Sequence, residues 1–121
     1  TMRVVSRRFP GADDVGGAFA LHEEWYALKN FASDLHVILV QETNNMQGGL
    51  YQRPPYPETW ARRQGKGRVF YTSMGHREDV WTDELFQTIV LGGLAWAIGN
   101  VDADVPSNLQ QVAPEAAPAR N

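Results

Sequence analysis

The sequence predicts an α/β domain whose sheet is parallel or mixed and lies under helices. Three segments support this fold class: a nearly continuous apolar and β-branched run at residues 35–40, a glycine-centred hairpin at residues 60–74, and an apolar helix at about residues 83–98. A short run that is apolar at nearly every position is typical of a strand buried on both faces. The 121 residues suffice for one domain with a modest core.

The first third of the chain has weaker patterns. The segment before residue 17 is polar and interrupted by breakers such as Pro10-Gly11, so we expect an irregular connector there, with a short strand at most at residues 4–5. Residues 19–31 mix apolar and charged side chains and suggest a helical turn at residues 23–28.

The middle of the chain contains the clearest strands. In the apolar run at residues 35–40, the single histidine, His36, is expected to pack near one end or to face a polar neighbour rather than bind a ligand. Glycines and prolines predict a loop at residues 44–57. Residues 60–74 then form a hairpin around Gly65-Lys66-Gly67, because glycine adopts the positive φ angles that tight turns require.

The last predicted element is a helix over about residues 83–98. Thr82 is expected to cap its start, and Gly99-Asn100 is expected to end it. The helix is apolar nearly all round, which predicts burial on more than one face. The pair Gly92-Gly93 costs about 1 kcal/mol per glycine relative to alanine, so we expect compensation from close packing against the sheet.

Composition excludes several classes of function. A net charge of -3 provides no basic surface for nucleic acid, and no apolar run is long enough to cross a bilayer. The apolar fraction of 43% and charged fraction of 21% are typical of a soluble globular protein. The chain has no cysteine, which excludes disulfides, thiolate nucleophiles and cysteine-based zinc sites within it.

The most informative local pattern is a strand that stops at Gly75-His76. Ligands of α/β proteins bind at the carboxyl ends of strands, where the loops leave a crevice. Three charged residues, Arg77, Glu78 and Asp79, follow the histidine directly. A histidine side chain exchanges protons near neutral pH and can act as a base, an acid or a metal ligand. We therefore predict a catalytic role for His76; the alternative is a histidine that only caps the strand.

The same region carries a family resemblance. The run from Gly65 to His76 (Gly-Lys-Gly-Arg-Val-Phe-Tyr-Thr-Ser-Met-Gly-His), with Trp81, Phe86 and the apolar stretch at residues 93–99, resembles the carboxyl-terminal half of a ThuA-like (trehalose utilisation) domain. Upstream, His22-Glu23-Glu24-Trp25-Tyr26 resembles the Asp/Glu-Glu-x-Tyr motif of that family, and Thr59-Trp60 resembles its Thr-Trp or Ala-Trp pair. The likeness covers roughly residues 20–105 in the family's order and spacing.

This resemblance implies a three-layer sheet of the flavodoxin-like or class I glutamine amidotransferase-like type, of which this chain would be a part. Residues 1–101 would be the carboxyl-terminal part of a ThuA-like domain, and residues 102–121, rich in alanine and proline, are expected to form an extended or disordered tail. Family members are about twice as long, so we expect a fragment whose exposed sheet edge favours pairing into a homo-oligomer.

The resemblance also selects candidate site residues. It favours Glu24 over Glu23 as the family's glutamate, with a role in orienting His76, acting as a base or helping to bind a cation; the alternative is a glutamate on a solvated helix face. Aromatic faces and planar polar groups suit sugars. Substrate-binding candidates are accordingly Tyr26, Tyr51, Arg53 and Arg77, whereas Trp60 is expected to be a core residue.

The implied function is bacterial sugar metabolism. The resemblance implies action on trehalose or a related disaccharide, through keto-sugar intermediates made by a partner dehydrogenase, with His76 moving a proton in a hydrolysis or an isomerisation. The cysteine nucleophile of class I amidotransferases is absent from this chain. The sequence does not choose between the cytoplasm and the periplasm.

Two alternatives remain open. One is a non-catalytic carbohydrate-binding or scaffold module, in which Tyr51 and Arg53 matter and His76 does not. The other is a metal-dependent hydrolase with His76, His22 and Glu24 as ligands of a divalent metal. No cofactor is otherwise evident, and these histidines do not show a diagnostic ligand spacing.

Overall fold

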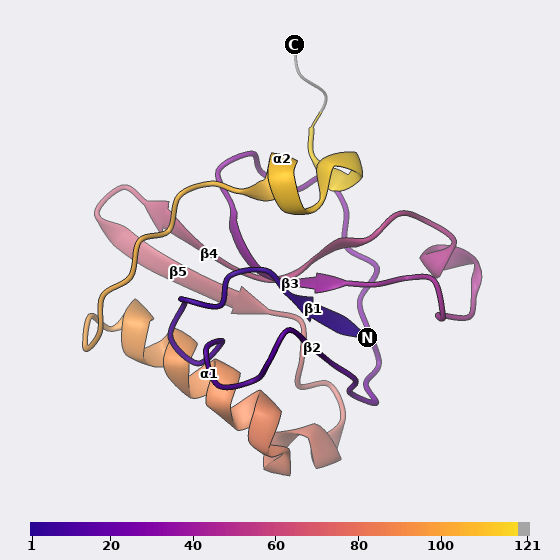
Figure 1. Cartoon of the computed structure of the whole chain (residues 1–121), viewed down its shortest axis with the longest axis horizontal. Coiled ribbons are helices and arrows are strands. Elements are labelled where there is room, and N and C mark those ends of the chain that lie inside the picture. Colours follow the sequence, from indigo (N-terminus) through magenta and orange to yellow (C-terminus); the bar gives the residue numbers. More distant parts are fainter. Residues whose placement is uncertain (119–121) are drawn as a thin grey trace.

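A computed structural model describes residues 1–118 and shows a small mixed α/β domain with a five-stranded antiparallel sheet (Figure 1). The strand order is β2-β1-β3-β4-β5. The strands are β1 (Met2–Val4), β2 (Ala18–Phe19), β3 (His36–Gln41), β4 (Tyr56–Gln64) and β5 (Gly67–Thr72). The helices are α1 (Glu84–Ala97) and α2 (Leu109–Val112), and 3₁₀ turns lie at Gly49–Tyr51, Glu78–Thr82 and Pro114–Ala116.

The α/β class is confirmed, but the expectation of a parallel or mixed sheet is wrong for the described residues. Each neighbouring pair of strands, from β1·β2 to β4·β5, is antiparallel. All six residues of β3 are buried, as the apolar run predicts. Their burial does not require parallel neighbours, because both faces of an antiparallel sheet can be covered as well.

Two hydrophobic clusters cover the two faces of β3. Ile38 and Leu39 belong to the cluster that includes α1, and Val37 and Val40 belong to the cluster that includes α2. Figure 1 shows α1 along one side of the sheet and α2 on the opposite side. Successive residues of a regular strand face opposite sides. Irregular pairing with β4 around Leu39 breaks this alternation, so the adjacent residues 38 and 39 join the same cluster.

The hairpin forms as predicted. Arg63 pairs with Arg68 and Gln64 pairs with Gly67, which leaves a two-residue turn in which Gly65 has a φ of 58°. The predicted loop at residues 44–57 ends earlier than expected, because β4 already begins at Tyr56.

Helix α1 differs from the prediction at its start and in its burial. The cap is Asp83 rather than Thr82, and its carboxylate accepts hydrogen bonds from the N–H groups of Leu85 and Phe86. Gly99, with a φ of 83°, lies just past the helix end as expected. The expectation of burial on more than one face is wrong. One face is buried through Phe86, Ile89, Gly93 and Trp96, whereas Leu91, Leu94 and Ile98 are exposed.

The two central glycines of α1 allow close approach, as predicted. A Cβ on Gly93 would lie 2.5 Å from the ring of Phe70 in β5. A Cβ on Gly92 would lie 2.2 Å from the carbonyl oxygen of Pro10. The helix therefore packs against the sheet at one glycine and against the amino-terminal connector at the other.

The amino-terminal third is irregular but contributes to the core. The connector after β1 buries Phe9, Ala12 and Val15 in the cluster under α1. The helical turn predicted at residues 23–28 is wrong, because residues 20–32 form neither helix nor strand. This segment is held instead by the side-chain hydrogen bonds described in the next subsection.

The expected extended or disordered tail is wrong for residues 109–116. These residues form α2 and a 3₁₀ turn, and Leu109 and Ala113 are buried against β3. The side chain of Asn108 accepts a hydrogen bond from the N–H of Val37 (2.7 Å) and donates one to its carbonyl oxygen (3.0 Å). The part of the predicted tail at residues 119–121 lies outside the described residues. Neither helix in the described part of the chain is both long and apolar enough to cross a membrane.

The contact between Gly92 and Pro10 leads to a stability prediction. We expect Gly92→Ala to lower the free energy of unfolding by about 1–3 kcal/mol, because the new methyl group meets backbone that cannot rotate away. At a helix position with open space the same change would be stabilising. Thermal unfolding measures the effect, with Leu91→Ala at the exposed neighbouring position as the control. A melting temperature equal to or above that of the wild type would contradict the packing described.

Candidate functional site

His76 lies in the loop that follows β5, beside Glu24. The Nε2 atom of His76 is 2.9 Å from Oε2 of Glu24, and the contact is an ion pair when the imidazole is protonated. The preceding Gly75 has a φ of 112°, a conformation that favours glycine and turns the chain at the strand end. The structure thus brings together the two residues that the sequence analysis selected as catalytic.

The loop that carries His76 is held by Glu23. The carboxylate of Glu23 accepts hydrogen bonds from three consecutive backbone N–H groups, those of Gly75 (2.7 Å), His76 (3.2 Å) and Arg77 (3.0 Å). Partial burial acts to raise the pKa of Glu23, but these N–H donors, with that of Glu24, outweigh it and lower the pKa below its ordinary value. Glu23 therefore positions the loop, and the neighbouring Glu24 is left to face His76.

A second glutamate, Glu58 of β4, holds the end of β5. It is fully buried and accepts hydrogen bonds from the N–H (2.9 Å) and hydroxyl (2.6 Å) of Ser73 and from the hydroxyl of Thr72 (3.2 Å). The hydroxyl of Thr59 also donates to it. Burial raises the pKa of Glu58, and these hydrogen bonds offset the effect only in part.

Sequence reasoning did not find the roles of these two glutamates. Glu58 lies between Pro57 and Thr59, next to a predicted strand. The available signal was a pair of hydroxyl residues, Thr72 at the end of the partner strand and Ser73 directly after it. For Glu23 no local pattern indicates that the side chain turns toward a loop far along the chain.

An open recess of about 480 Å³ adjoins the His76–Glu24 pair. Its lining residues are Glu24, His76, Arg77, Glu78 and Asp79. The guanidinium of Arg77 donates two hydrogen bonds to the carboxylate of Asp79 in a bidentate pair, and both nitrogen–oxygen distances are 3.0 Å. These hydrogen bonds raise the pKa of Arg77 and lower that of Asp79.

The charges of the recess suit a neutral polyhydroxyl ligand better than an anion. Three carboxylates line it, and the guanidinium of Arg77 is already occupied by Asp79. Carboxylate oxygens accept hydrogen bonds from hydroxyl groups. Arg77, a predicted substrate-binding residue, thus lies in the recess with its charge partly neutralised.

Tyr26 lies at the edge of the same imidazole. Its ring is perpendicular to that of His76, with 6.3 Å between the ring centroids, and it is about half exposed (52%). Two further tyrosines fix its segment: Tyr56 donates to the carbonyl oxygen of Tyr26 (2.9 Å), and Tyr51 donates to that of Trp25. Burial raises the pKa of Tyr56 to about 12, so its hydroxyl remains a donor at neutral pH.

The structure does not bring every predicted residue into the recess. Tyr26, Tyr51 and Arg53 are not among the residues that line it. The guanidinium of Arg53 lies over the ring of Tyr56, 4.3 Å from its centroid. The predicted core role of Trp60 agrees with its stacking on Tyr71, at 4.2 Å between centroids.

His22, the third ligand of the predicted metal site, lines a separate depression with Asp79. Within residues 1–118, no three side chains among histidine, aspartate and glutamate come together as a group that could hold a metal ion. The metal-dependent alternative thus gains no support from the positions of these residues.

A comparison with family models matches residues 1–97 to the ThuA family, described as trehalose utilisation. Searches of curated proteins and of solved structures give no significant match.

The contacts of Glu23 predict a pH-dependent loop. We expect the amide-proton shifts of Gly75, His76 and Arg77 to titrate together with a midpoint below 4.5, the ordinary value for glutamate. Because the pKa is lowered on folding, the stability that Glu23 contributes is present above the unfolded-state pKa and is lost as the pH falls through the folded-state pKa. NMR titration measures the midpoint.

Glu23→Gln should weaken protection of these three amides from hydrogen exchange at neutral pH, because the new NH₂ group cannot accept a hydrogen bond. Glu78→Gln, at an exposed position of the same loop, is the control. Unchanged protection in Glu23→Gln would refute the role of this carboxylate.

Glu58 should have the opposite pH dependence. Its pKa is raised on folding, so its contribution to stability is present below the unfolded-state pKa and is lost as the pH rises through the folded-state pKa. The melting temperature of Glu58→Gln should therefore shift upward relative to the wild type between about pH 4 and about pH 8. A shift in the other direction in calorimetric melts would show that hydrogen bonds keep Glu58 ionised.

Proposed function

Because the chain belongs to the ThuA family of trehalose utilisation, we propose that it acts in carbohydrate metabolism by moving a proton on a sugar at His76. The observation that carries this proposal is the 2.9 Å contact between His76 and Glu24 at the edge of an open recess. A histidine paired with a carboxylate is a common arrangement for general acid–base catalysis.

The contact favours one assignment of the imidazole protons. A carboxylate oxygen close to Nε2 favours the proton on that nitrogen, which leaves Nδ1 with a lone pair in the neutral ring. In the described part of the chain Nδ1 of His76 makes no hydrogen bond. Nδ1 would then take the proton from the sugar, and the negative charge of Glu24 would stabilise the imidazolium that forms.

The proposed substrate is a keto-sugar derived from trehalose or a related disaccharide. A carbonyl group acidifies the hydrogen on the adjacent carbon, and its removal starts either an elimination that leads to hydrolysis or an isomerisation. A partner dehydrogenase would supply the carbonyl. Tyr26 would cover one face of the sugar ring, and the carboxylates of Glu78 and Asp79 would accept hydrogen bonds from its hydroxyls.

Tyr51 and Arg53 have different parts in this proposal. Tyr51 holds the backbone next to Tyr26, which makes it a positioning residue. Arg53 would reach a sugar only as an outer contact beyond the recess.

We also propose that the described sheet belongs to a larger flavodoxin-like or amidotransferase-like layered domain. Such layering needs parallel strands in addition to the antiparallel strands within residues 1–118.

Solvent deuterium exchange tests the proton transfer directly. The full chain is incubated with keto-trehalose in D₂O, and NMR follows the hydrogen on the carbon beside the carbonyl. We expect exchange above the buffer rate, a loss of at least about 100-fold in His76→Gln, and a smaller loss, about 10-fold, in Glu24→Gln.

His22→Gln is the matched control, because it changes an exposed histidine outside the recess. It should keep the wild-type rate. Equal exchange rates in the wild type and His76→Gln would refute catalysis by His76.

A non-catalytic carbohydrate-binding role is the second candidate. The high exposure of His76 (46%) and Glu24 (73%) favours it, because water screens their interaction. In that case calorimetric titration would show sugar binding by both the wild type and His76→Gln, without deuterium exchange in either.

A further inference from the structure

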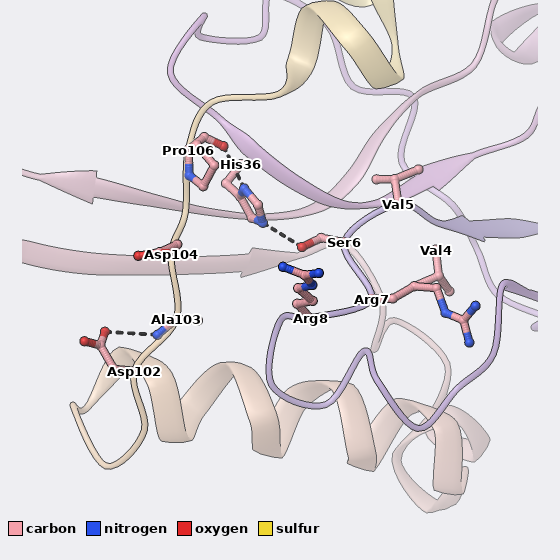
Figure 2. A pocket seen from close by; sticks show the side chains of 10 residues that line it. All are labelled: Val4, Val5, Ser6, Arg7, Arg8, His36, Asp102, Ala103, Asp104 and Pro106. Carbon is pink, nitrogen blue, oxygen red and sulfur yellow. Dashed lines mark hydrogen bonds between the residues drawn. The ribbon is translucent and has the colours of Figure 1, made fainter.

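A second cavity, of about 660 Å³, lies at a different part of the sheet (Figure 2). Its walls are the connector after β1, the start of β3 and the segment that leads to α2. The lining residues are Val4, Val5, Ser6, Arg7, Arg8, His36, Asp102, Ala103, Asp104 and Pro106. None of them lines the recess beside His76. His36 begins β3 whereas His76 follows the end of β5, and β3 and β5 run in the same direction, so the two sites lie toward opposite ends of the sheet.

His36 is buried, with 6% of its surface exposed, and both of its ring nitrogens have partners. Nδ1 is 2.7 Å from the carbonyl oxygen of Pro106, and Nε2 is 2.7 Å from the hydroxyl oxygen of Ser6. Figure 2 shows the ring between these two groups.

The partners determine the direction of both hydrogen bonds. A carbonyl oxygen only accepts, so Nδ1 of His36 carries the proton that it donates to Pro106. In the neutral ring Nε2 is then the acceptor, and the hydroxyl of Ser6 must donate to it. The hydrogen bonds thus run in the same direction as in a catalytic serine site. There the serine hydroxyl donates to a histidine that acts as general base, and a third group orients the histidine.

We propose that Ser6 and His36 form a second catalytic site, which cleaves short-chain acyl esters of polar alcohols. The Oγ of Ser6 attacks the ester carbonyl carbon, and its proton passes to Nε2 of His36. The tetrahedral intermediate expels the alcohol, which takes that proton and leaves the acyl group on Ser6. Water, deprotonated by His36, then releases the acid and restores the serine, so the net reaction consumes one ester and one water.

The cavity walls match the two halves of such a substrate. Val5 provides apolar surface for a short acyl chain, and the exposed carboxylate of Asp104 provides an acceptor for hydroxyl groups of the alcohol. Val4 belongs to the core under α1, and the carboxylate of Asp102 is paired with Arg68. In Figure 2 the guanidinium of Arg8 extends toward the Ser6 hydroxyl, whereas that of Arg7 points away from it. Arg8 is thus placed to stabilise negative charge on the carbonyl oxygen of the intermediate.

Ser6 is accessible for this reaction. Its side chain is only partly buried, and it sits at the start of the turn closed by the hydrogen bond from the Phe9 N–H to the Ser6 carbonyl oxygen. The buried base and the accessible hydroxyl together give a nucleophile that solvent-borne reagents can reach.

A fluorophosphonate probe, which forms a phosphonyl ester with an activated serine and releases fluoride, tests the nucleophile. The full chain is labelled, digested and analysed by mass spectrometry, and hydrolysis of p-nitrophenyl acetate is measured in parallel. We expect the label on Ser6, and a loss of labelling and of hydrolysis of at least about 100-fold in Ser6→Ala. Ser33→Ala, at an exposed serine outside the cavity, should behave as the wild type.

His36→Gln separates catalysis from a purely structural role. Glutamine is polar and of similar size but is not a base, so a folded His36→Gln protein, checked by circular dichroism, should keep the Ser6 hydroxyl and lose its labelling. Wild-type chain without label on Ser6, or Ser6 labelled equally fast in a folded His36→Gln, would overturn the proposal. If His36→Gln does not fold, the test rests on the other two results. A label on Ser6 that is lost in Ser6→Ala supports the proposal, and the absence of that label overturns it.

Discussion

The carboxylate of Glu23 joins the irregular segment at residues 20–32 to the loop that follows β5. Three backbone N–H groups of that loop point to one side chain, and an ionised carboxylate with several N–H donors is a strong anchor. The arrangement of the candidate site depends on this anchor. Glu24 meets His76 because its neighbour is bound to the same loop.

Polar side chains hold the irregular parts of this molecule to its sheet. Glu58 binds the end of β5 from inside the sheet, Asn108 pairs with the backbone of Val37 in β3, and His36 connects the amino-terminal connector to the segment before α2. An unpaired polar group in the interior is costly, so each such group specifies which segment must lie next to it. These contacts place residues that neither helix nor strand propensity would place.

The two proposed sites share this construction. At each end of the sheet a histidine lies where an irregular segment meets a strand, with an acceptor oxygen 2.7–2.9 Å from one of its ring nitrogens. They differ in exposure, because His76 lies in an open recess whereas His36 is buried. The first arrangement suits proton transfer on a ligand that approaches from solvent. The second suits activation of a fixed hydroxyl group.

The sequence by itself determined the hairpin, the buried strand β3, the body of α1 and the membership of the ThuA family, because hydrophobic runs, turn glycines and a family motif are local signals. Local signals also selected His76 and Glu24 as candidates. Only the tertiary structure decided that the sheet is antiparallel, that α1 buries one face, that residues 109–112 are helical, and that Glu23 and Glu58 hold the site. Each of these depends on partners distant in the sequence, whose contacts no local pattern encodes.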